Sequence, residues 1–232
     1  MSNGTPDSNP QAQSMGSFDF NAFINESKET LLNPKAYFAS MKGTGGLLEP
    51  LIKASIYGAA AGVFAFIFSI LGLSLGSFGL VGNAMGVMAL VLLIIDAIIG
   101  LFIGAIFILI ISIICKGSND FELNVRISAS LLVLLPIMIL LGFISGLNFY
   151  LGLFVNLAIG LYGLWLLYFA LVEALKADLK PSRIAVLIMA GFFSILIIAA
   201  AVKTRSMTKK IMDGFDDYKE MMKDMEKEKE NN

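Results

Sequence analysis

Four stretches of the sequence contain no Asp, Glu, Lys or Arg, and they constrain the fold more than any other feature. A bilayer core about 30 Å thick requires roughly 20 apolar residues for each helix that crosses it. The stretches have the lengths expected for one, one, two and one spans, in this order: Ala54 to Ile95, Ala97 to Cys115, Ile127 to Val172 and Ile184 to Val202.

Composition agrees with a membrane location. Charged residues make up 15% of the chain and hydrophobic residues 57%, whereas a soluble domain carries about 25% charge. We therefore predict an all-α, polytopic transmembrane helical bundle of about five spans. The spans are expected at residues 51–75, 88–115, 126–147, 151–173 and 184–202.

The predicted organisation has four parts, and two of them flank the spans with helices of their own. Asn33 suits a helix N-cap and Pro34 the first helical position, so we expect a short interfacial helix before the first span. Gly43 to Gly46 form a hinge after it. The parts are residues 1–32, a mostly disordered polar tail; 33–49, interfacial helix and hinge; 50–202, the transmembrane domain; and 203–232, a charged helical tail.

The C-terminal tail combines eight basic and eight acidic residues with one narrow apolar stripe. Such a stripe is typical of an amphipathic helix. It could bind another protein, lie on a lipid surface or form a short coiled coil, and a solvated helix is an equal alternative. The stripe consists of Ile211, Phe215, Tyr218, Met222 and Met225.

Basic residues in short loops mark the cytoplasmic side of a membrane. The loops at 116–126 and 173–183 and the segment before the first span all carry Lys or Arg. They predict a cytoplasmic N-terminus. The basic residues just after the last span disagree, because five spans place them outside.

Small residues follow a 4-3-4-3-4 spacing along the first span. Lipid offers no hydrophobic drive for helix pairing, and small residues at this spacing allow two backbones to approach closely. We expect an intimate helix contact, either within the chain or with a membrane-protein or homo-oligomeric partner. The stripe comprises Gly58, Gly62, Ala65, Ser69, Gly72 and Gly76.

The second span repeats this pattern around a charge. Asp96 shares a helical face with Gly100 and Gly104, and an ionisable side chain in hydrocarbon usually faces the bundle interior. Asp96 is therefore either a buried polar clamp or an intramembrane proton or cation site. In the third span, Pro136 predicts a helix kink.

Several functional classes are excluded by missing residues. The chain has no histidine, which removes the commonest general base and the commonest metal ligand. Cys115 has no partner for a disulfide, and a net charge of −1 argues against nucleic acid. We expect no catalytic residues, no metal, no cofactor and no enzyme activity.

Four soft motifs occur in a characteristic order: the Asn33-Pro34 helix, the loop from Gly117 to Glu122 before a proline-bearing span, the segment from Leu161 to Glu173, and Pro181 to Ala185. In this order they resemble Yip1-domain membrane proteins of the prokaryotic type. The resemblance implies a helical bundle with a cytosolic N-terminus, in the plasma (inner) membrane of a prokaryote. Eukaryotic relatives are similar to factors that bind Rab-type GTPases and act in vesicle traffic, but this chain lacks their aspartate-leucine-tyrosine-glycine-proline motif.

Two functions follow from these observations. The first is a non-enzymatic membrane scaffold or interaction protein, in membrane organisation or a trafficking-like process, whose partners are the lipid bilayer and a protein bound by the small-residue stripes or the C-terminal helix. The alternative is a small transporter or channel built around Asp96.

Overall fold

The computed structural model describes residues 19–71 and 86–203, and they contain helices and no strand. Five helical segments are long and apolar enough to cross a membrane, which confirms the predicted fold class. They are Leu48–Ile70, Leu90–Ile114, Phe121–Leu147, Phe149–Ala174 and Leu179–Lys203. The Gly72 and Gly76 positions and the apolar stripe of the C-terminal tail lie outside the described residues.

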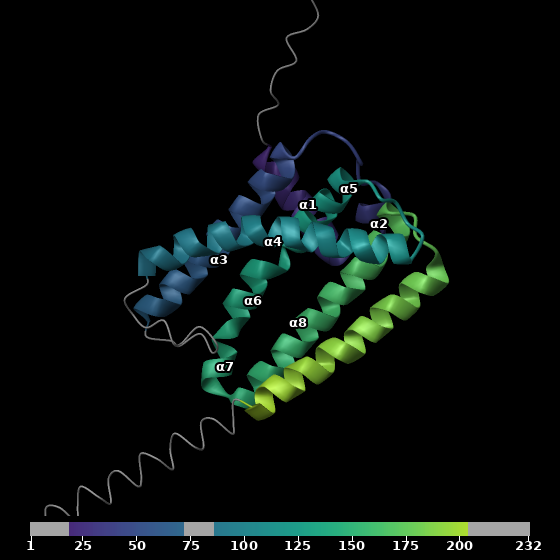
Figure 1. The fold of residues 1–232 in the computed structure, drawn as a ribbon. Coiled ribbons are helices and arrows are strands. Elements are labelled where there is room, and N and C mark those ends of the chain that lie inside the picture. Colours follow the sequence, from purple (N-terminus) through teal and green to yellow (C-terminus); the bar gives the residue numbers. More distant parts are fainter. Residues whose placement is uncertain (1–18, 72–85, 204–232) are drawn as a thin grey trace, which may run out of the picture.

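The spans form a bundle in which α3 is the most extensively packed helix (Figure 1). Helix α3 (Leu48–Ile70) packs along α4 (Gly86–Ile114) and also contacts α5 and α6. Helix α8 (Phe149–Phe169) contacts α6 and continues into a π-helical turn, η3 (Ala170–Ala174). The last helix, Leu179–Lys203, runs beside α8, and its Phe193 ring lies against Gly160.

Three helices begin at side chains that cap their free backbone N–H groups. Asp19 accepts from the first turn of α1, Asp120 from that of α5, and Asn148 from that of α8. A capping side chain satisfies donors that a helix cannot bond internally. These three residues therefore fix where the three helices start.

The third span is divided as its proline predicts. Helix α5 (Phe121–Leu131) ends just before Leu132, and α6 (Leu134–Gly142) and α7 (Ile144–Leu147) follow it. Pro136 cannot donate to the carbonyl four residues earlier, and its ring crowds that group. That carbonyl belongs to Leu132, at the junction where α5 stops and α6 starts.

The N-terminal region differs from the sequence interpretation. Residues 1–32 were expected to be a mostly disordered tail, yet α1 occupies Phe20–Leu32. Helix α2 (Pro34–Ala39) begins at Pro34 as expected, but it packs against η3 and α8, and its Phe38 side chain is fully buried. Burying an aromatic side chain stabilises the fold more than leaving it exposed at the membrane surface. This burial therefore favours docking of both helices on the end of the bundle.

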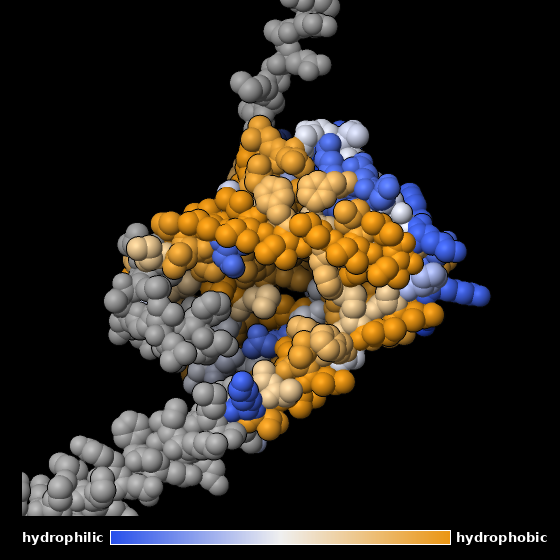
Figure 2. All heavy atoms as spheres, viewed as in Figure 1, coloured by the Kyte–Doolittle hydropathy of each residue, from blue (hydrophilic) through white to orange (hydrophobic). Residues whose placement is uncertain are grey.

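Hydrophilic residues gather at one end of the molecule (Figure 2). This polar end consists of residues 19–53, 115–126 and 175–183, which include α1, α2, the segment between α2 and α3, and the first turns of α3, α5 and the last helix. The loops at residues 115–120 and 175–178 are joined by backbone hydrogen bonds, from Ser118 N–H to Leu175 O at 2.7 Å and from Asp178 N–H to Cys115 O at 3.0 Å. Apolar side chains cover much of the remaining surface, as expected for helices in lipid.

Candidate functional site: an ion-pair network at the polar end

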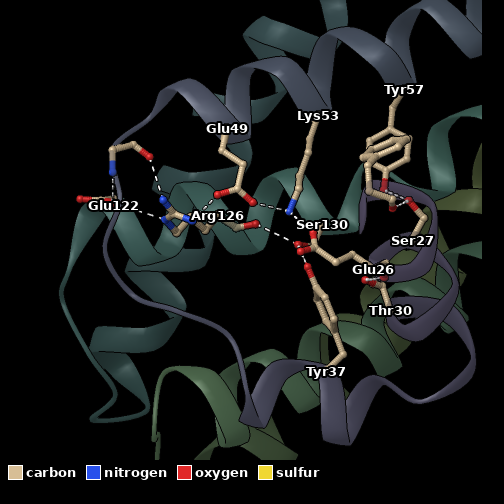
Figure 3. A network of polar contacts seen from close by, with 12 residues as sticks. Glu26, Ser27, Thr30, Tyr37, Glu49, Lys53, Tyr57, Glu122, Arg126 and Ser130 are labelled. Atoms are coloured by element: carbon tan, nitrogen blue, oxygen red, sulfur yellow. Dashed lines mark hydrogen bonds and ion pairs between the residues drawn. The ribbon is translucent and has the colours of Figure 1, made fainter. Parts of the chain in front are cut away.

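Charged side chains from three helices meet at the polar end (Figure 3). The Lys53 ammonium group, on α3, binds the Glu26 carboxylate of α1 and lies 2.8 Å from Glu49 Oε1. The Lys53 side chain is 11% exposed, whereas both carboxylates are about 40% exposed. A cation this buried requires close counter-charges, so Lys53 ties α1 to the start of the first span.

Arg126 extends the network from α3 to α5. Its Nη1 lies 2.9 Å from Glu49 Oε2, and its Nε lies 3.3 Å from Glu122 Oε1. Glu49 thus uses one oxygen for each cation. We call these five side chains, Glu26, Lys53, Glu49, Arg126 and Glu122, the ion-pair network.

The segment between α2 and α3 takes part through its backbone. Arg126 Nη2 donates to Gly46 O at 3.0 Å, and the Gly46 N–H donates to Glu122 Oε1 at 2.6 Å. Gly45 and Gly46 have φ values of +135° and +83°, which residues with a side chain rarely adopt. A Cβ on Gly45 would also lie 2.6 Å from Arg126 Nη2. The expected glycine hinge therefore has a backbone conformation that hydrogen-bonds Arg126 and Glu122.

Hydroxyl groups add further links between α1, α2 and the spans. Tyr57 of α3 pairs with Ser27 of α1 at 2.7 Å, and Tyr37 of α2 pairs with Ser130 of α5 at 2.7 Å. The Tyr162 hydroxyl of α8 donates to the Leu31 carbonyl. Each bond satisfies a polar atom that would otherwise be costly near lipid. Together they hold α1 and α2 against three different spans.

A cavity of about 450 Å³ lies beside the network. Its lining comes from α1, α2, the residues that follow α2, the start of α3, and α5. The charged residues among the lining are Glu26, Glu29, Lys42, Glu49, Lys53 and Arg126. Three cations face three carboxylates, so the cavity has no excess charge to select an anion or a metal cation.

The two cations and three carboxylates of the network are paired with one another, and among residues 19–71 and 86–203 no group of three His, Cys, Asp or Glu side chains could hold a metal ion. Cys115 is fully buried in the apolar core, on the side of α4 that packs inward. A buried thiol in apolar surroundings is inert.

The small residues of the first span contact α4. A Cβ built on Gly58 would lie 2.8 Å from the Ile94 Cα, and one on Gly62 would lie 2.7 Å from the Leu90 Cα. Ala65 is buried against α6, and Ser69 is half-buried near the end of α3. The sequence predicts a close helix contact either within the chain or with a partner chain. For Gly58 and Gly62 the structure shows the contact within the chain.

The second small-residue pattern is split between two sides of α4. Gly104 faces α5, where its Cβ would lie 2.5 Å from Ser128 Oγ, whereas nothing lies within 4 Å of a Cβ on Gly100. Asp96 is exposed. The expectation that Asp96 faces the bundle interior is therefore wrong for the single chain, because the inward side of α4 is occupied by Ala97, Leu101 and Ala105.

Sequence reasoning missed the network because it used Lys53 and Arg126 only as basic markers of membrane orientation and did not pair them with Glu26, Glu49 and Glu122. A usable signal was present in the spacing. Glu49 and Lys53, and likewise Glu122 and Arg126, are four residues apart at the starts of two apolar helices. Such i,i+4 pairs lie on one helix face. Two such pairs, each at the cytoplasmic start predicted for its span, predict that the four charged side chains form one cluster.

Comparison with known proteins identifies the family. The family model of the Yip1 domain matches residues 28–202, from α1 to the end of the last helix. No curated protein and no solved structure matches the chain. The matched region contains every member of the ion-pair network except Glu26, together with all five spans. The chain therefore belongs to the Yip1 domain family of membrane proteins.

Proposed function

We propose that this protein is a non-enzymatic membrane scaffold whose polar end binds an acidic partner protein in the cytoplasm. One observation carries the proposal: the polar groups of the ion-pair network and of the hydroxyl pairs form contacts that attach α1 and α2 to the spans. Active sites direct such groups toward a substrate. Here they build a rigid platform at the end of the bundle.

The exposed charges of the polar end support an acidic partner. Among the described residues of this end, four acidic side chains are exposed, and one of them, Asp178, lies 3.9 Å from Lys116. The exposed cations outnumber them; they are Lys28, Lys35, Lys42, Lys116, Lys176, Lys180 and Arg183. A basic surface attracts acidic surfaces and speeds their association.

The same cations support a cytoplasmic location for the polar end. Short loops rich in Lys and Arg remain on the cytoplasmic side during insertion. This orientation puts the platform where soluble proteins can reach it. It also agrees with the absence of basic residues in the turn at 146–150, at the opposite end of the bundle.

Charge reversal at the polar end tests the proposal. Lys42 is exposed on the rim of the cavity, and Lys203 is exposed at the far end of the last helix. The variants Lys42→Glu and Lys203→Glu make the same change of charge at opposite ends. Tagged proteins are purified from native membranes in mild detergent, and co-purifying proteins are quantified by mass spectrometry.

We expect Lys42→Glu to lower the recovery of a specific acidic partner by about fivefold, because one attraction becomes a repulsion. Lys203→Glu should leave that recovery unchanged. If no protein is enriched with the unmodified chain, or if both variants lose the same proteins equally, the proposal fails.

A further inference from the structure

Two lysines of the polar end have a left-handed backbone, and in the part of the chain that the structure describes no other residue except glycine does. Lys116 has a φ of +59° and Lys176 a φ of +54°. Each lies two residues beyond the end of a span, Leu90–Ile114 for Lys116 and Phe149–Ala174 for Lys176. Glycine is the usual residue for this conformation at a helix end, because a Cβ is strained there. Both positions therefore carry a cation where the backbone favours a residue without a side chain.

Backbone contacts bring the two lysines to one place, where α4 and η3 end (Figure 1). The hydrogen bonds that join the loops at 115–120 and 175–178 lie on both sides of them. A Cβ built on Gly117 would lie 3.0 Å from the Ala177 Cβ. The residues that directly follow the two lysines are thus in contact, so both side chains start from the same small area of the surface.

The last helix adds two further cations. Lys180 and Arg183 lie in its first two turns, three positions apart and therefore on one side of the helix. The helix begins directly after Asp178, which lies 3.9 Å from Lys116. A helix N-terminus carries partial positive charge, so local electrostatics disfavour cations here as well. We call these four exposed residues the basic cluster: Lys116, Lys176, Lys180 and Arg183.

Acidic side chains offset only part of this positive charge. Asp178 and Lys116 are both more than half exposed, so their attraction is small. The Asp120 side chain caps α5, and Glu173 is half-buried in η3. No carboxylate among the described residues pairs with the other three cations of the cluster. The cluster therefore retains positive charge that a ligand from outside the chain can neutralise.

Exposed apolar side chains adjoin the basic cluster on the side of the spans. Figure 2 shows hydrophilic residues of the polar end directly beside hydrophobic ones. Cations at the end of a span lie at the level of lipid headgroups, and the apolar residues that follow lie among acyl chains. A molecule with a negative phosphate group and acyl chains matches both surfaces, whereas a soluble acidic protein matches only the first. The apolar residues are Ile113 and Ile114 of α4 and Leu179, Ile184 and Leu187 of the last helix.

We propose that the basic cluster binds the headgroup of an anionic phospholipid, in the leaflet on the side of the polar end. The phosphate oxygens accept hydrogen bonds from the lysines, and the planar Arg183 guanidinium binds two oxygens at once. The acyl chains lie along the exposed apolar residues of α4 and the last helix. The orientation rule accounts for basic residues anywhere in a loop, whereas a bound phosphate also accounts for lysine at two strained positions.

Glycine substitutions test the proposal, because glycine suits the left-handed backbone. The double variant Lys116→Gly with Lys176→Gly removes two cations of the cluster and relieves the strain. Its matched control, Lys28→Gln with Lys35→Gln, removes two exposed cations from α1 and α2 at the same end. The full-length proteins in detergent are titrated with phosphatidylglycerol or with phosphatidylcholine of the same acyl chains. Native mass spectrometry counts the bound lipid.

The unmodified chain and the control should bind phosphatidylglycerol more tightly than phosphatidylcholine. The glycine variant should lose this preference by at least about fivefold, the effect of one Lys or Arg near an anionic surface. Its thermal unfolding temperature in lipid-free detergent should not fall. Glycerol 3-phosphate, which carries the phosphate without acyl chains, should not displace the lipid at equal concentration.

Equal losses in the glycine variant and the control would show diffuse attraction to the whole polar end and overturn the site. No preference for phosphatidylglycerol in the unmodified chain, or displacement by glycerol 3-phosphate, would overturn it too. A lower unfolding temperature for the glycine variant would mean that the lysines support the loops, and the proposal would fail. No other protein is present and Lys42 is unchanged in every variant, so the result is independent of the acidic partner.

Discussion

Glu49 holds the central place among the charged residues, because its two carboxylate oxygens bind different cations. Lys53 lies in its own helix one turn away, and Arg126 is 77 positions further along the chain. Both cations are about one-tenth exposed, so neither can be fully solvated when Glu49 changes. One residue therefore supports the junction of α1, α3 and α5.

Replacing Glu49 by glutamine should lower the free energy of unfolding by about 2 kcal/mol. A fully buried pair costs about 3–5 kcal/mol when one partner is removed, and partial exposure of Glu49 reduces that cost. Chemical unfolding in detergent micelles measures the change. Glu29→Gln is the control, since Glu29 is an exposed residue of the same cavity. Equal unfolding midpoints for the two variants would show that the network does not support the fold.

The spacing of small residues predicted helix contacts correctly on α3 but not around Asp96 on α4. The small-residue spacing on α3 predicts a close contact, and Gly58 and Gly62 make one with the backbone of α4. The same logic placed Asp96 inward beside Gly100 and Gly104, and it was misleading there. Every residue near Asp96 on α4 is apolar or small, so hydropathy alone cannot distinguish the inward side of that helix from the outward side.

A methyl group at Gly62 should separate α3 from α4. Its Cβ would lie 2.7 Å from the Leu90 Cα, a backbone atom that cannot rotate away. We expect Gly62→Ala to lower the thermal unfolding temperature in detergent, although alanine favours helix by about 1 kcal/mol. Gly191→Ala, on the open side of the last helix, should raise that temperature slightly. A rise for both variants would contradict the close α3–α4 contact.

For the whole molecule, the five spans and the all-helical class could be predicted from sequence, because uncharged stretches longer than 18 residues have few alternatives to a membrane. The docking of α1 and α2 could not. It depends on Phe38 burial and on hydrogen bonds such as Tyr37 to Ser130, which join residues 93 positions apart. Local patterns carry no information on such distant contacts.

Five crossings require particular residues to lie on opposite sides of the membrane. Labelling of single cysteines in a Cys115→Ser background, with a membrane-impermeant thiol reagent on intact and then on opened cells, is the most direct measurement. We predict that Lys116→Cys and Lys176→Cys react only after the cells are opened, whereas Leu147→Cys and Lys203→Cys react in intact cells. If Lys203→Cys and Lys116→Cys were labelled from the same side of the membrane, the chain would cross the membrane an even number of times between these two residues. That result would contradict the five-span bundle.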